Sequence, residues 1–127
     1  MTVALDASAL LAMLRGEPGA DKVKAELADA VISAVNLSEV TAKLSDYGMP
    51  PEDVAATFAQ FDLDVRAFDA PQAYLAGRLR QVTRGNGLSL GDRACLALAS
   101  QLAVDAMTAD HAWAGLSLDG ITVQLIR

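Results

Sequence analysis

Two aspartates directly follow segments that are predicted to form β-strands. Asp6 comes after the β-prone residues 2–5, and Asp110 comes shortly after the predicted strand 104–108. Parallel strands end at the same edge of a sheet, and ligands of open α/β sheets bind outside the carboxyl ends of the strands. If these two strands are neighbours, we expect the two carboxylates to lie close together at that edge.

Two further acids fall in the first turns of predicted helices. Glu39 lies three residues after Asn36, and Asp92 lies three residues after Ser89. Helices that connect parallel strands run antiparallel to those strands, so their N-termini point to the carboxyl edge of the sheet. We therefore expect one topology to bring all four acids to the same edge.

Each of these acids also has an ordinary structural explanation when it is taken alone. Asp6 and Asp110 can be helix N-caps, and the pairs at 36/39 and 89/92 fit capping boxes. A carboxylate at a helix N-terminus gains only ~0.3–1 kcal/mol. Two carboxylates about 4 Å apart repel by about 4 kcal/mol at an effective dielectric constant near 20. Four converging acids therefore need a cation, and oxygen ligands suit Mg²⁺ or Mn²⁺.

The net charge is negative, with 16 acidic against 10 basic residues and a formal charge of −6. This balance argues against a protein that binds nucleic acid through a broadly basic surface. Setting the four candidate site acids aside leaves a surface that is nearly balanced. Six basic residues could still contact phosphate, and Arg93, beside Asp92, is the preferred one: Arg15, Lys43, Arg78, Arg80, Arg84 and Arg93.

Length and composition predict one compact domain that spans residues 1–127. One Cys and one His can form neither an intrachain disulfide nor a four-ligand Cys/His zinc site, and this cysteine content fits a reducing cytoplasm. The N-terminal residues lack the basic region of a signal peptide, and no apolar run approaches the ~18 residues of a membrane span. We therefore expect a cytoplasmic protein that is not inserted in a membrane.

The elements that must position the acids follow from apolar periodicity and from breaks at Gly and Pro. β-Prone runs predict strands at residues 2–5, 30–33, 63–68, 104–108 and 121–126. Helical periodicity predicts helices at about 9–15, 19–28, 36–46, 51–61, 69–84 and 89–102, with a short helical turn at 112–113. The alternation predicts a parallel sheet covered by helices on both faces, with the apolar helix 89–102 buried between layers.

The local sequences around the four acids resemble those of the PIN-domain family, and in particular its VapC-type toxins. They read DASALL at Asp6, NLSEVTAKL around Glu39, LSLGDRACLALA around Asp92 and TADHAW at Asp110. The resemblance covers essentially the whole chain. It implies a three-layer α/β/α fold with a central parallel five-stranded sheet of order 3-2-1-4-5. It also implies a metal-dependent ribonuclease that is the toxin of a type II toxin–antitoxin pair, a homodimer, and a VapB-type antitoxin as partner.

The resemblance also implies which residues form the site. Carried over position by position, the catalytic and metal-binding acids are Asp6, Glu39, Asp92 and Asp110. They would hold one or two Mg²⁺ or Mn²⁺ ions that activate a water to attack the RNA phosphodiester. Ser8 and Thr108 match positions where a small hydroxyl supports the acids, and a turn-capping role for them stays equally open.

Other functions are compatible with parts of this pattern. A PIN-like scaffold could be catalytically silent and serve only to bind a partner. A phosphoacceptor receiver domain is also small, acidic and Mg²⁺-binding, but here the first strand ends in a single Asp rather than an acidic pair. His111 has no second histidine to work with, and Cys95 lies in an apolar helix and is expected to be a packed thiol. The ordered set of four acids favours the nuclease.

Overall fold

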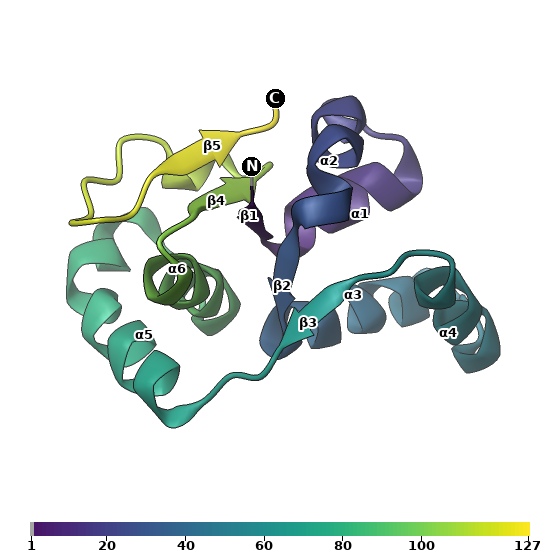
Figure 1. Ribbon diagram of the computed structural model, residues 1–127, viewed down its shortest axis with the longest axis horizontal. Helices are drawn as coiled ribbons and strands as arrows, with labels where there is room; N and C mark the ends of the chain where they lie inside the picture. The colour runs from purple at the N-terminus through teal and green to yellow at the C-terminus, as the bar shows by residue number, and fades with distance from the viewer. Residues whose placement is uncertain (1) are drawn as a thin grey trace.

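Five short strands form one parallel sheet in the order β3-β2-β1-β4-β5 (Figure 1). The computed structural model describes residues 2–127. The predicted strands all form, and they are β1 (Val3–Leu5), β2 (Val31–Ser33), β3 (Asp64–Arg66), β4 (Asp105–Thr108) and β5 (Val123–Leu125). The flavodoxin-like order of receiver domains is 2-1-3-4-5, so the observed order separates this chain from the receiver alternative.

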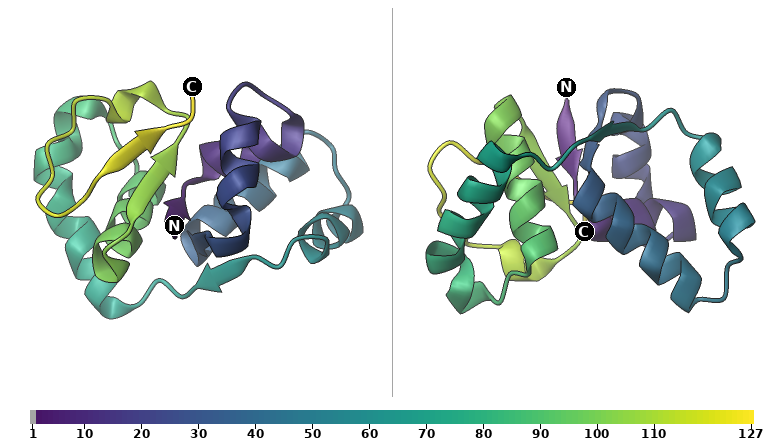
Figure 2. Two further views of the ribbon diagram at one scale, coloured as in Figure 1. Left: turned by 45° about the horizontal axis from the view of Figure 1, so that its top comes forward. Right: turned by 90° about the horizontal axis from the view of Figure 1, so that it is seen from below.

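Helices cover both faces of the sheet, which gives the three-layer α/β/α architecture (Figure 2). One face is covered by α1 (Ala7–Arg15), α2 (Ala20–Glu26), α3 (Ala34–Asp46) and α4 (Pro51–Ala59), and the other by α5 (Ala70–Thr83) and α6 (Leu90–Leu102). Short 3₁₀ turns follow or connect them at η1 (Leu27–Asp29), η2 (Arg84–Asn86) and η3 (His111–Trp113). Within residues 2–127, no helix is both long enough and apolar enough to cross a bilayer.

The central strands feed two separate hydrophobic cores, one on each face of the sheet. In β1, Val3 and Leu5 pack into the core under α1 and α3, whereas Ala4 packs into the core under α6. This is the two-residue alternation of a strand that is buried on both faces. In α6, every side chain from Ala94 to Ala99 is buried, as its all-round apolar character predicts.

The outer strand β3 is shorter than its β-prone sequence suggests. The predicted strand covers 63–68, but only Asp64–Arg66 pairs with β2, and all three residues are exposed. The Asp64 carboxylate accepts a 2.8 Å hydrogen bond from the Arg66 guanidinium on this open edge. Charged side chains on an edge strand oppose pairing with another chain, and a strand with one neighbour has few hydrogen bonds to extend it.

Helix α3 begins two residues earlier than Asn36, the predicted start. Ser33 is its N-cap, because the Ser33 hydroxyl accepts a hydrogen bond from the Val35 N–H at 3.2 Å. Asn36 therefore lies inside the first turn, and it is fully buried. The predicted capping box at Asn36 and Glu39 is wrong, since the end of β2 supplies the cap instead.

Candidate active site

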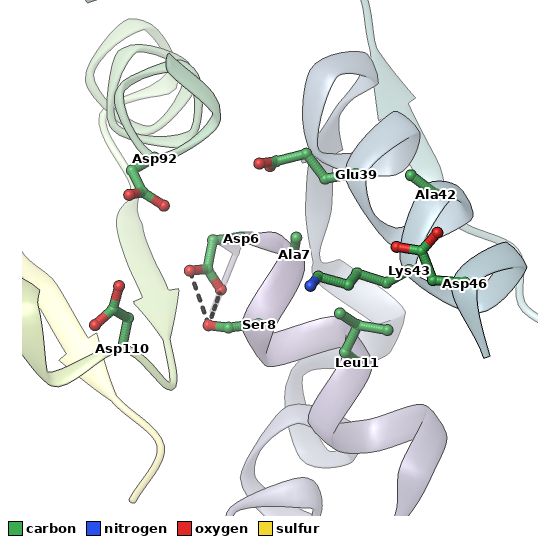
Figure 3. A pocket seen from close by; sticks show the side chains of 10 residues that line it. All are labelled: Asp6, Ala7, Ser8, Leu11, Glu39, Ala42, Lys43, Asp46, Asp92 and Asp110. Atoms are coloured by element: carbon green, nitrogen blue, oxygen red, sulfur yellow. Dashed lines mark hydrogen bonds between the residues drawn. The ribbon is translucent and has the colours of Figure 1, made fainter. Parts of the chain in front are cut away.

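The four predicted acids line one cavity at the carboxyl edge of the sheet (Figure 3). Asp6 follows β1 and Asp110 follows β4, and these two strands are direct parallel neighbours. Asp92 enters from the first turn of α6, and Glu39 enters from the second turn of α3. The cavity has a volume of about 370 Å³, and its remaining lining residues are Ala7, Ser8, Leu11, Ala42, Lys43 and Asp46.

Asp6 is the most deeply buried of the four acids, with 2% of its surface exposed. Its Oδ1 accepts the Ala9 N–H at 2.8 Å, which makes it the N-cap of α1. Burial raises the pKa of Asp6 from 3.8 to about 6, although hydrogen bonds from Thr108, Ala9 and Ser8 lower it. The negative charge of Asp92 raises this pKa further. The site thus penalises an ionised Asp6 unless positive charge arrives.

Two hydroxyl groups join Asp6 to the end of β4. The Thr108 hydroxyl donates to Asp6 Oδ2 at 2.6 Å and accepts the Asp110 N–H at 3.0 Å. The Ser8 hydroxyl donates to Asp6 and accepts the Ala109 N–H at 2.9 Å. Ser8 and Thr108 therefore fix the position of the Asp6 carboxylate relative to the backbone that carries Asp110.

Glu39 reaches the cavity from the facing helix α3. Its side chain is half-buried, and Asn36 Nδ2 donates a 2.8 Å hydrogen bond to Glu39 Oε1. Burial raises the pKa of Glu39, the hydrogen bond from Asn36 lowers it, and the charge of Asp92 adds a smaller upward shift. The charge of Asp92 thus acts on both Asp6 and Glu39, so these three acids influence one another electrostatically.

Asp92 and Asp110 serve as caps while they line the cavity. The predicted capping box at Ser89 and Asp92 is confirmed, with the Ser89 N–H donating to Asp92 Oδ2 at 2.9 Å. Asp110 Oδ1 accepts the Ala112 N–H at 2.9 Å at the start of η3. Each cap uses one carboxylate oxygen, so capping and a role in the cavity are compatible.

Arg93 does not line the cavity, contrary to the prediction that it is the preferred phosphate contact. Only 8% of its surface is exposed, and its Nη1 donates a 2.8 Å hydrogen bond to the Ala76 carbonyl of α5. Consecutive helix residues point in directions about 100° apart, so Arg93, next to Asp92, points toward α5 in the same helix layer. The basic side chain in the lining is Lys43, which extends from α3 toward the acids (Figure 3).

Lys43 and Asp46 are lining residues that the acidic pattern does not single out. They lie four and seven residues after Glu39 on α3, a spacing that keeps side chains on one helix face. The sequence offers Lys43 only as one of six basic residues that could contact phosphate. The helical spacing from Glu39 is the feature of the sequence that could have identified both Lys43 and Asp46.

The donor set of the cavity matches a hard divalent cation. Its acidic oxygens suit Mg²⁺ or Mn²⁺, whereas the buried Cys95 is out of reach, since its thiol donates toward the Ala4 carbonyl at 3.7 Å. In residues 2–127, no three His, Cys, Asp or Glu side chains are arranged to hold one metal ion together. Mg²⁺ commonly binds one or two carboxylates directly and keeps several waters, so this spacing fits a hydrated ion.

The charge around the cavity also affects Cys95 beneath it. Burial raises the pKa of the Cys95 thiol well above its usual value, and the charges of Asp6, Asp92 and Glu39 raise it further. The thiol therefore stays protonated and packed, as expected from the apolar helix around it.

Comparison with solved structures finds the same fold in other proteins. Three similar solved structures are a DNA-bound VapBC from Salmonella typhimurium, VapBC2 from Rickettsia felis bound to a promoter DNA fragment, and a toxin–antitoxin complex from Klebsiella pneumoniae. Their identities are 16%, 14% and 20%, and their TM-scores are 0.77, 0.73 and 0.72. The matches cover 100%, 98% and 94% of this chain and 99%, 98% and 95% of the others.

At these identities the solved structures establish the fold. No curated protein matches the chain. The family evidence comes from the sequence, because the PIN domain model matches residues 3–117, which include all four acids of the cavity. The chain therefore belongs to the PIN domain family.

Proposed function

We propose that this chain is a Mg²⁺-dependent endoribonuclease that acts as the toxin of a type II toxin–antitoxin pair, as VapC-type proteins do. PIN domains are generally nucleases, and those nucleases generally use divalent metals. The observation that carries the proposal is the meeting of Asp6, Glu39, Asp92 and Asp110 in one cavity from four separate elements.

In this proposal, Asp6 and Asp92 would hold one or two Mg²⁺ or Mn²⁺ ions, and Glu39 and Asp110 would contribute less directly. Bound there, the metal would lower the pKa of a water and neutralise charge that develops on the phosphate. Ser8 and Thr108 keep the Asp6 carboxylate oriented through their hydrogen bonds. Lys43 offers its ammonium group to a phosphate oxygen of the RNA backbone at the mouth of the cavity.

The products of the reaction test this chemistry. Attack of water on phosphorus needs no 2′-hydroxyl and leaves 5′-phosphate and 3′-hydroxyl ends. RNA cleaved by the purified chain with Mg²⁺ should ligate to adaptors that require those ends, and Asp92→Asn should abolish cleavage. Ligation to adaptors that require a 2′,3′-cyclic phosphate would reject the mechanism.

The proposed partners follow from the structural neighbours. Several of them are described as VapBC complexes or toxin–antitoxin complexes, and some are bound to DNA. We propose a VapB-type antitoxin as the partner of this chain. We also propose that the chain forms a homodimer, that residues 1–127 form one domain, and that the protein is located in the cytoplasm. Co-expression with a short DNA-binding protein encoded next to this gene should yield a stable complex, and sedimentation should give the subunit number.

A catalytically silent PIN scaffold is the second candidate. It is compatible with the hydrogen bond that each acid makes within the fold, since these bonds give every acid a structural role that needs no metal. Calorimetric titration with Mn²⁺ separates the candidates. Uptake of Mn²⁺ that Asp92→Asn removes supports the nuclease, and absence of uptake supports the silent scaffold.

A further inference from the structure

Asn36 occupies an unusual position for an amide side chain. It is fully buried in the first turn of α3, where its Nδ2 donates to Glu39 Oε1 at 2.8 Å and to the Gly91 carbonyl at 2.9 Å. Its Oδ1 has no hydrogen-bond partner in the described part of the chain. The second bond joins α3 to α6, which cover opposite faces of the sheet. One amide group thus ties the amino ends of both helices together at the edge of the cavity.

Gly91 leaves the space that Glu39 occupies. A Cβ atom placed on Gly91 would overlap the Glu39 carboxyl group, so any other residue would push that group away. Gly77 in α5 gives the contrast, because nothing lies within 4 Å of a Cβ atom there. Gly91 also directly precedes Asp92 in the first turn of α6. The Glu39 carboxyl group is therefore packed against the backbone that positions Asp92.

This arrangement works against electrostatics. Glu39 and Asp92 carry like charges, and a glutamate side chain has three rotatable bonds by which it could swing toward solvent. The hydrogen bond from Asn36 restrains that motion on one side, and the vacant position at Gly91 allows close approach on the other.

We propose that Asn36 is a positioning residue which, with the space left by Gly91, holds the Glu39 carboxylate beside Asp92 in the acidic cavity. The inference rests on the proposed metal-dependent function, and it identifies what fixes the geometry of that site. Neither Asn36 nor Gly91 contacts the RNA or the metal in this scheme. Both act through Glu39.

The experiment is a set of double-mutant cycles read by calorimetric titration with Mn²⁺. Asn36→Leu removes both donors at similar volume, and Gly91→Ala displaces the Glu39 carboxyl group. Each should weaken Mn²⁺ binding by roughly 10–100-fold, the range seen when partners of metal ligands are mutated. In a Glu39→Ala background, each should change the affinity by less than about threefold. Equal losses in both backgrounds, or no loss in the parent, would overturn the inference.

Matched controls separate positioning from a general loss of structure. Gln72 is also a buried amide that joins two helices, through a 2.6 Å bond from Nε2 to Gln101 Oε1, but it lies away from the cavity. Gln72→Leu should lower stability and leave Mn²⁺ affinity unchanged, and Gly77→Ala should leave it unchanged too. If Gln72→Leu weakens Mn²⁺ binding as much as Asn36→Leu does, Asn36 has no special role.

A measurement without metal keeps this inference separate from the proposed function. If the parent chain takes up no Mn²⁺, the proposed function fails, and urea unfolding followed by Trp113 fluorescence still tests the arrangement. Alanine favours a helix over glycine, so Gly91→Ala should raise the unfolding midpoint more in the Glu39→Ala background than in the parent. The same rise in both backgrounds would show that Gly91 and Glu39 are independent and would overturn the inference.

Discussion

At the scale of single residues, the cavity is lined by a buried carboxyl group and by an exposed ammonium group. Asp6 is buried and ionisable, Lys43 is exposed and basic, and both line the same space. A buried carboxylate is costly to ionise unless a charge partner is near. The metal-free protein should therefore reveal the site through its response to pH and to substitution of these residues.

The raised pKa of Asp6 gives a pH dependence with a definite sign. Its pKa is about 6 in the folded chain against 3.8 ordinarily, so the folded state binds the Asp6 proton more tightly than the unfolded state does. The stability from Asp6 is complete below its ordinary pKa and is lost as the pH rises through the folded value. The difference is about 3 kcal/mol. Urea unfolding between about pH 4 and 7 should show this loss in the parent.

Asp6→Asn provides the comparison, because it removes the titrating group and should remove that part of the pH dependence. Mg²⁺ should oppose the effect, since a bound cation favours the ionised carboxylate and releases its proton. Proton release is measured by titrating Mg²⁺ near pH 6 in buffers of different ionisation enthalpy. Identical pH profiles for parent and Asp6→Asn would contradict the burial argument.

Lys43 should contribute to RNA binding rather than to metal binding. Lys43→Ala is expected to raise KM for RNA several-fold and to leave Mn²⁺ affinity undiminished, because a nearby positive charge is lost. One phosphate contact fewer should reduce the slope of log affinity against log salt by roughly 0.7 for a single strand. Lys22→Ala, outside the cavity, is the control. An unchanged salt slope would remove Lys43 from the RNA contact.

At the scale of elements, the succession of strands and helices along the chain could be predicted from the sequence, whereas their first and last residues could not. Short, largely apolar runs identify β1, β2 and β4, since a strand that is buried on both faces needs apolar side chains on both. The edge strand β3 is shorter than its sequence suggests because only one neighbour supports it. The cap of α3 is Ser33 rather than Asn36, because a fully buried asparagine finds partners from a distant helix that sequence spacing does not reveal.

The same difference between local and distant information applies to the candidate site. The four acids could be predicted to converge because strand and helix polarity alone carries them to one edge. Arg93 could not be placed, because its direction depends on the packing of α6 against α5. The hydrogen bonds of the Ser8 and Thr108 hydroxyls form only if β1 and β4 are neighbours. The order of strands in the sheet came from the resemblance to the family and not from the sequence pattern.

Thr108 tests the link between β4 and α1. Thr108→Val keeps the shape but removes the donor to Asp6 Oδ2, leaving a buried carboxylate oxygen without this bond. We expect a loss of about 1–3 kcal/mol in the free energy of unfolding, together with weaker Mn²⁺ binding. Thr83→Val is matched, since Thr83 is also fully buried and donates to the Leu79 carbonyl at 2.8 Å within α5. It should reduce stability alone; equal effects on Mn²⁺ would contradict the link.

At the scale of the whole molecule, the sheet separates two hydrophobic cores, one on each face. The four acids lie at the carboxyl edge of that sheet, between the two helix layers. A ligand that binds only the native state stabilises the entire domain by RT ln(1 + [L]/Kd), which is about 2.7 kcal/mol at a hundredfold excess over Kd. Metal binding should therefore be visible in global unfolding.

Asp92→Asn separates the two roles of this residue in global stability. Relief of repulsion with Asp6 and Glu39 should preserve or raise the metal-free Tm, because an asparagine oxygen can still accept the capping bond. The Tm increase on adding Mg²⁺ should largely disappear. Asp69→Asn is the matched control, since Asp69 caps α5 outside the cavity, and it should retain the Mg²⁺ response. A uniform loss of a few degrees with and without Mg²⁺ would favour a purely capping role.

The pairing of β1 with β4 also bears on the birth of the protein. Residues 3–5 align with residues 105–107, so the two central strands are far apart in the sequence. A ribosome must translate the message through residue 110 before Asp6 and Asp110 can meet. Nascent chains that end or stall before residue 110 therefore lack the assembled carboxylates, and any activity of this site requires a chain that extends past that residue.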